Sequence, residues 1–140
     1  MAELQKKLYP AKIAGFETEQ GEENFHRLLE MDAVEVVQAD IGWAGGFTGC
    51  IRIAEDARKH GKPFSLHSFG SAVHFAASLQ LASGLSNTEM IESEENQNML
   101  RSGIANESFE TDGSMGFLVP GKSGIGITLD MDRIESLIAR

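Results

Sequence analysis

The sequence predicts an α/β fold built from repeated strand–helix units with parallel strands. Short apolar runs alternate with helix-like segments along the 140 residues, and an ionisable residue follows four of these runs. These residues are Glu17, Asp40, His67 and Glu92, separated by 23, 27 and 25 positions. One strand with its helix and loops needs about 25 to 30 residues, since α/β barrels of about 250 residues contain eight such units. In that fold the carboxyl ends of the strands carry the chemistry, although acids and histidines also follow strands as simple caps or turn residues.

The first predicted elements are a helix over residues 2–8 and a strand over residues 12–16, which leads into Glu17. Residues 22–31 predict an amphipathic helix. Its apolar side chains recur at helical spacing and form one stripe, made by Phe25, Leu28 and Leu29. Acidic residues at the start of this segment suit the positive end of a helix dipole.

The stretch that follows is the clearest strand–helix unit. Residues 34–40 contain the β-branched run of a buried strand and end in Asp40. Glycines between positions 42 and 46 predict a tight turn, and residues 48–60 predict a helix with Thr48 as its N-cap.

The third unit begins with a predicted strand over residues 63–67, which ends in His67. Ser71 is expected to cap an alanine-rich helix over residues 72–83. This helix is apolar on almost every side and therefore needs cover on more than one face. We expect His74 within it to be a packed core or rim histidine rather than a ligand.

A fourth strand is predicted over residues 88–91, directly before Glu92, whereas residues 93–110 predict no regular element. Residues 116–123 match the literal pattern of a phosphate-binding loop. That loop needs a following helix and converging backbone amides, but here Pro120 removes an amide and the chain extends. Nucleotide binding is therefore not expected.

The remaining segment predicts short strands at 117–119 and 125–129 and a final helix capped by Asp130. We expect residues 1–118 to form the main strand–helix body. Residues 119–140 form a tail of turn, strand and helix within the same domain.

Composition excludes several classes of protein. A net charge of −9 and a pI near 4.8 argue against nucleic-acid binding, which needs a basic face. No apolar run is long enough for a membrane span or signal peptide, so a cytoplasmic location is the default expectation. The single cysteine, Cys50, allows no disulfide within the chain, and we expect it to be a small core residue.

In this order and spacing, the sequence resembles the mandelate racemase/muconate lactonizing enzyme family of the enolase superfamily. The resemblance covers about residues 12–130 and implies strands five to eight of a (β/α)8 barrel, the carboxyl-terminal half of a TIM-type barrel. The segments that carry it are Glu17 after a strand, Asp40 with Gly45-Gly46, Ser65-Leu-His67-Ser, Glu92, and Pro120-Gly121 with Gly124-Ile-Gly126.

The resemblance implies a role for each of the four ionisable residues. Glu17 matches a Mg²⁺ ligand, and Asp40 with His67 matches an Asp–His dyad in which the histidine is the general base or acid. Glu92 matches an acid that hydrogen-bonds the substrate carboxylate. The muconate-lactonizing branch uses a lysine on the sixth strand, and residues 40–44 contain none, so the Asp–His branch is the better match. Phe16 departs from the family pattern, in which a glycine commonly precedes the metal-binding glutamate.

The family's site also uses earlier metal ligands, a lysine base and a capping domain, none of which can be placed in this sequence. One glutamate does not hold Mg²⁺ against water, so we expect the 140 residues alone not to run the full reaction. Open strand edges would favour a homo-oligomer or a complementing amino-terminal half. The implied function is an acid-sugar dehydratase or racemase acting on a small carboxylate. A non-catalytic half-barrel assembly module or a truncated fragment is the alternative.

Overall fold

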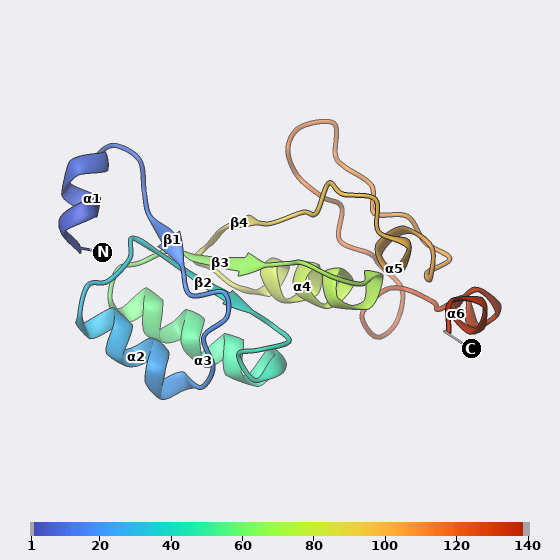
Figure 1. Ribbon diagram of the computed structural model, residues 1–140, viewed down its shortest axis with the longest axis horizontal. Helices are drawn as coiled ribbons and strands as arrows, with labels where there is room; N and C mark the ends of the chain where they lie inside the picture. The colour runs from blue at the N-terminus through green and yellow to red at the C-terminus, as the bar shows by residue number, and fades with distance from the viewer. Residues whose placement is uncertain (1, 139–140) are drawn as a thin grey trace.

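Four parallel strands form one sheet in the computed structural model, which describes residues 2–138. They lie side by side in chain order: β1 (Ala14–Gly15), β2 (Val36–Asp40), β3 (Phe64–His67) and β4 (Thr88–Ile91). Each strand is joined to the next by a helix, as Figure 1 shows. The predicted α/β fold of repeated strand–helix units is therefore confirmed.

Three helices connect the strands: α2 (Glu22–Glu30), α3 (Gly46–Lys59) and α4 (Ala72–Gly84). In Figure 1, α2 and α3 lie side by side below the sheet, and α4 lies beside β3 and β4. The main core fills the space between the sheet and these helices with buried apolar side chains, including Phe25, Val37, Ala39, Cys50, Ile53, Phe64 and Leu66. Burial of Cys50 confirms its expected place in the core.

Side chains along β2 alternate between the two faces of the sheet, because successive residues of a strand point in opposite directions. Val37 and Ala39 belong to the core below the sheet. Gln38 and Asp40 therefore point to the opposite face, and their register partners on β3 are Ser65 and His67. The polar residues of the two strands thus share the face away from α2 and α3.

The turn between β2 and α3 differs from the prediction that Thr48 caps the helix. Helix α3 begins at Gly46 and its N-cap is Gly45, with φ 86°. Gly49 already donates a helical hydrogen bond to the Gly45 carbonyl at 3.2 Å, so Thr48 lies inside the first turn. A side chain at Gly49 would meet the Ala44 carbonyl oxygen at 2.0 Å, so this close turn requires glycine.

Strand β1 is shorter than predicted, since only Ala14 and Gly15 pair with β2. Phe16 adopts φ 86°, a left-handed conformation that ends the strand and that glycine adopts far more readily. The backbone at this position is thus the one a glycine would favour, although the side chain is phenylalanine.

The strands predicted at 117–119 and 125–129 are wrong. Each region makes one isolated antiparallel bridge, Thr111 with Phe117 and Ala105 with Leu129. Before residue 117 the chain forms a local turn, in which the Asp112 carboxylate accepts hydrogen bonds from the amides of Ser114 and Gly116. The chain also turns, rather than entering a helix, after the segment that matches a phosphate-binding loop.

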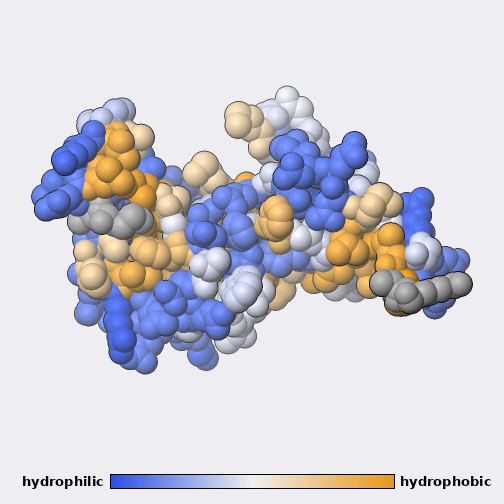
Figure 2. Space-filling view, in the orientation of Figure 1, coloured by the Kyte–Doolittle hydropathy of each residue, from blue (hydrophilic) through white to orange (hydrophobic). Residues whose placement is uncertain are grey.

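Three further helices complete the described chain: α1 (Ala2–Leu8), α5 (Met99–Ser102) and α6 (Met131–Leu137). Asp130 caps α6 as predicted, accepting a hydrogen bond from the Arg133 amide at 3.0 Å. Figure 2 shows apolar side chains gathered beside α1 and near α6, where Leu4, Leu8 and Leu137 are exposed. No helix within residues 2–138 is both long and apolar enough to cross a membrane.

Candidate active site

Asp40, the last residue of β2, lies at the centre of a polar cluster at the carboxyl edge of the sheet. Its side chain is 2% exposed, and Oδ2 lies 2.7 Å from Nδ1 of His67. His67 ends β3 and is the register partner of Asp40. The parallel pairing of two adjacent strands therefore places these side chains together.

The other carboxylate oxygen of Asp40 has two partners of its own. Oδ1 accepts a hydrogen bond from the Gly42 amide at 2.6 Å and lies 2.9 Å from Nε2 of His74. We expected His74 to be a packed core or rim histidine, and that expectation did not include its specific contact with Asp40. Its position in the first turn of α4, which follows the carboxyl end of β3, is the sequence signal that could have suggested it.

Two opposing effects act on the pKa of Asp40. Burial alone would raise the pKa, but hydrogen bonds from His74, His67 and the Gly42 amide together hold it below its usual range. Asp40 is therefore a carboxylate at neutral pH, and a carboxylate only accepts hydrogen bonds. We assign protons to the facing ring nitrogens, Nδ1 of His67 and Nε2 of His74, which leaves Nε2 of His67 free to accept a proton.

Glu92 directly follows β4 and completes the cluster. Its Oε2 lies 3.6 Å from Nε2 of His67, and its Oε1 accepts a hydrogen bond from Gln38 at 2.6 Å. The Glu92 amide donates to the Leu66 carbonyl, which continues the pairing of β4 with β3. Because the Glu92 side chain is 48% exposed, residues 2–138 alone do not enclose this side of the site.

Comparisons with known proteins show the family to which the chain belongs. The enolase C-terminal domain-like family matches residues 1–133 of the chain. The chain belongs to the enolase superfamily, in its mandelate racemase/muconate lactonizing enzyme group.

Curated relatives of this enolase-superfamily chain are named for reactions of a sugar acid or of a sugar-acid lactone. Arabinonate dehydratase from Saccharolobus solfataricus is 32% identical over 117 residues, which are 84% of this chain and 31% of that protein. D-galactarolactone cycloisomerase from Agrobacterium fabrum is 27% identical over 133 residues, covering 89% of this chain and 35% of that protein. The enolase-superfamily chain thus spans about a third of the length of these relatives.

Solved structures resemble it over nearly its whole length. A 3,6-anhydro-D-galactonate cycloisomerase from Zobellia galactanivorans is 26% identical with a TM-score of 0.84, covering 96% of this chain and 38% of that one. A structure described as a mandelate racemase from Bordetella bronchiseptica, complexed with 2-oxoglutarate/phosphate, is 25% identical with a TM-score of 0.89. That match covers 98% of this chain and 36% of the other. The expected partial barrel is confirmed.

The implied Mg²⁺ ligand, Glu17, lies two residues beyond β1 at the same carboxyl edge of the sheet and is half-buried. A carboxylate oxygen suits this hard cation, but Mg²⁺ needs near-octahedral coordination by several oxygens. Across residues 2–138, Glu17 belongs to no close group of three metal-ligating side chains. Residues 2–138 therefore supply no group of acidic, histidine or cysteine side chains that would hold Mg²⁺ together with Glu17.

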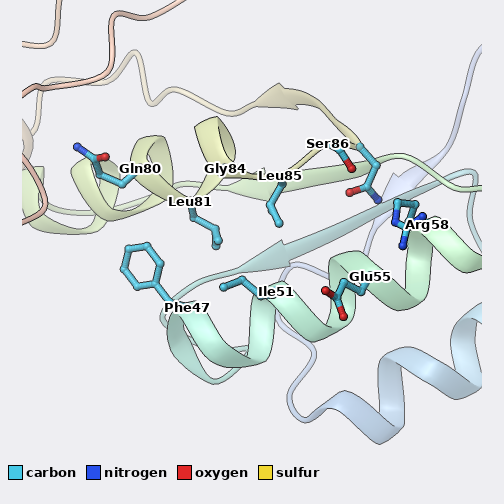
Figure 3. Close-up of a pocket in the computed structure, with 10 residues that line it drawn as sticks. Phe47, Ile51, Glu55, Arg58, Gln80, Leu81, Gly84, Leu85 and Ser86 are labelled. Atoms are coloured by element: carbon cyan, nitrogen blue, oxygen red, sulfur yellow. The ribbon is translucent and has the colours of Figure 1, made fainter.

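A groove of about 490 Å³ lies between α3 and α4 on the helical side of the molecule, as Figure 3 shows. Phe47, Ile51, Leu81 and Leu85 supply its apolar lining. None of Asp40, His67 and Glu92 lines it. In this enolase-superfamily chain, the polar cluster at the carboxyl edge is the better candidate for chemistry, because it combines a buried charge with two imidazoles.

Proposed function

We propose that this chain is the carboxyl-terminal half-barrel of an acid-sugar dehydratase or a related racemase, with His67 as the general base. The observation that carries the proposal is the 2.7 Å contact between Asp40 Oδ2 and His67 Nδ1. This contact orients the imidazole and stabilises the imidazolium that forms when Nε2 accepts a proton. The sugar-acid relatives support the substrate class.

In the proposed reaction, Nε2 of His67 takes the proton from the carbon next to the substrate carboxylate. The electron pair of that C–H bond moves toward the carboxylate and forms an enediolate. For dehydration, the pair then forms a carbon–carbon double bond as the β-hydroxyl leaves, and His67 returns its proton to that hydroxyl to release water. Glu92 would hydrogen-bond the substrate carboxylate. Asp40 would keep the imidazole of His67 oriented during both proton transfers.

Dehydration is preferred over racemisation within this proposal. Racemisation needs a second base on the opposite face of the substrate, for which a lysine is typical in this family. Lys12 and Lys62 precede β1 and β3, at the amino end of the sheet, and pair with Glu89 and Asp32. Neither of these two lysines therefore lies with His67 at the carboxyl ends of the strands.

The segment after residue 118 belongs, in this proposal, to the same domain as the strands. The Gln80 side chain on α4 donates hydrogen bonds to the carbonyls of Pro120 and Ile125, at 2.7 and 3.3 Å. The bridge between Ala105 and Leu129 makes a second link. These contacts support a tail that folds onto the half-barrel.

The test combines solution mass with an assay. The chain would be mixed with Mg²⁺ and a panel of aldonic and aldaric acids. One sample would contain the chain alone. A second would also contain, as a separate polypeptide, the part of the Saccharolobus solfataricus arabinonate dehydratase that this chain does not match. We expect turnover in the complemented sample that disappears in His67→Asn. His26→Asn is the matched control and should keep full turnover, because His26 lies on α2 away from the strand ends. Equal turnover in His67→Asn would overturn the role of this base.

The second candidate is a non-catalytic assembly module. Strands β1 and β4 each pair on one side only, and Met90 on β4 is 57% exposed. An unpaired edge is a template for another strand. This candidate predicts an even-numbered assembly or a stable complex with the supplied segment. It also predicts no turnover and no Mg²⁺ affinity tighter than millimolar.

A further inference from the structure

A second cluster of ionisable side chains lies on the helical side of the molecule, where α2 packs against α3. His26 of α2 faces Asp56 and His60 of α3, and one potential ligand atom from each residue lies within 4.8 Å of the other two. Nδ1 of His26 lies 2.8 Å from Asp56 Oδ2, and Nδ1 of His60 lies 3.6 Å from Asp56 Oδ1. The two imidazole rings meet edge to face, with centroids 5.9 Å apart.

We propose that His26, Asp56 and His60 form a site for Zn²⁺ or a similar late first-row divalent ion. Two imidazoles and a carboxylate are a donor set that Zn²⁺ commonly takes, with a water or further ligand completing a tetrahedron. This site is separate from the polar cluster around Asp40 and does not rest on the proposed catalytic function. Bridging α2 to α3, a bound ion would stabilise the packing of the two helices.

Helix α3 and its C-cap place two of the three proposed ligands side by side. Asp56 and His60 are four residues apart on α3 and its C-cap, so their side chains share one face of the helix. Nδ1 of His60 lies 2.9 Å from the Asp56 carbonyl oxygen, to which it donates. This hydrogen bond places the ring proton on Nδ1 and leaves Nε2 with its lone pair, as is usual for metal-ligating histidines.

The third ligand comes from α2, and its position depends on the packing of the two helices. Ligand atoms around tetrahedral Zn²⁺ are about 3.4 Å apart, as the usual Zn–N distance requires. The candidate ligand atoms of the cluster lie within 4.8 Å of one another, and their side chains are exposed to partly exposed.

The test uses the four histidines of the chain as reporters. Imidazole signals would be followed by NMR during Co²⁺ addition, and Zn²⁺ affinity would be measured by calorimetry. We expect the signals of His26 and His60 to broaden first, with one Zn²⁺ per chain. Asp56→Asn and His60→Gln should each weaken binding about tenfold or more.

His74→Gln is the matched control and should leave the Zn²⁺ affinity unchanged, since His74 contacts Asp40 instead. Circular dichroism of each variant would check that α2 and α3 remain folded. Earlier broadening of His67 and His74 would place the ion at the Asp40 cluster and overturn the proposal. Unchanged affinity in both Asp56→Asn and His60→Gln would overturn it as well.

Discussion

Nε2 of His74 lies 2.9 Å from Oδ1 of Asp40, on the opposite side of the carboxylate from His67. Asp40 therefore contacts two imidazoles at once and also accepts a hydrogen bond from the Gly42 amide. A buried charge is stable only when its lone pairs are satisfied in this way. His74 is thus a positioning residue for the carboxylate that orients the proposed base.

His74→Leu should raise the pKa of Asp40. The substitution removes a hydrogen bond that lowers this pKa, while the burial that raises it remains. Asp40 stabilises the fold above its unfolded pKa of about 3.9, and this stability is lost as pH falls through the lower folded value. The loss should therefore be smaller in His74→Leu and should be complete at a higher pH than in the original protein.

Carbon-detected NMR of the Asp40 carboxyl group measures this titration directly. His26→Leu is the control and should leave it unchanged, because His26 pairs with Asp56. An identical Asp40 titration in His74→Leu would mean that the 2.9 Å contact does not influence the carboxylate.

Gly49→Ala should lower the free energy of unfolding by about 1–3 kcal/mol, the usual cost of forcing an extra group into a packed site. The new Cβ would lie 2.0 Å from the Ala44 carbonyl oxygen, so the turn between Asp40 and α3 must shift. Urea unfolding measures the effect. Gly84→Ala is the matched control, because the Cβ that it adds would meet no atom within 4 Å and alanine favours a helix. Equal stability of the two variants would contradict the close approach at Gly49.

Phe16→Gly should be more stable than Phe16→Ala by about 1 kcal/mol, because only glycine adopts positive φ without steric cost. Both substitutions remove the contact of Phe16 with the core, so their difference isolates the backbone conformation at φ 86°. Thermal unfolding of the pair measures this difference. A more stable alanine variant would show that residue 16 does not hold the left-handed conformation.

Lys122→Gln should raise the titration midpoint of Glu107. A hydrogen bond from Lys122, followed by one from the Thr128 amide, lowers the pKa of Glu107 to about 2. The stabilising contact is therefore present above the unfolded pKa of about 4.3 and is lost as pH falls toward 2. The Thr128 amide shift reports this step, since this amide donates to Glu107 Oε2 at 2.6 Å. Lys62→Gln should not move the midpoint, because Lys62 pairs with Asp32.

Local sequence patterns were sufficient to predict most elements of the half-barrel. The β-branched run of β2, the Ser71 cap of α4 and the Asp130 cap of α6 each depend on neighbouring residues, and each was predicted correctly. The strands predicted near residues 117 and 125 failed because a strand needs a partner along its length. Apolar residues in a short run do not reveal whether such a partner is available.

The sequence by itself determined that Asp40, His67 and Glu92 follow three successive parallel strands, because the period of the strand–helix units sets their positions at one edge of the sheet. The tertiary structure alone decided that His74 contacts Asp40 and that His26 meets Asp56. Those pairs join residues on different elements, and their contact depends on how the helices pack. No local pattern encodes that packing, since it results from the burial of the whole core.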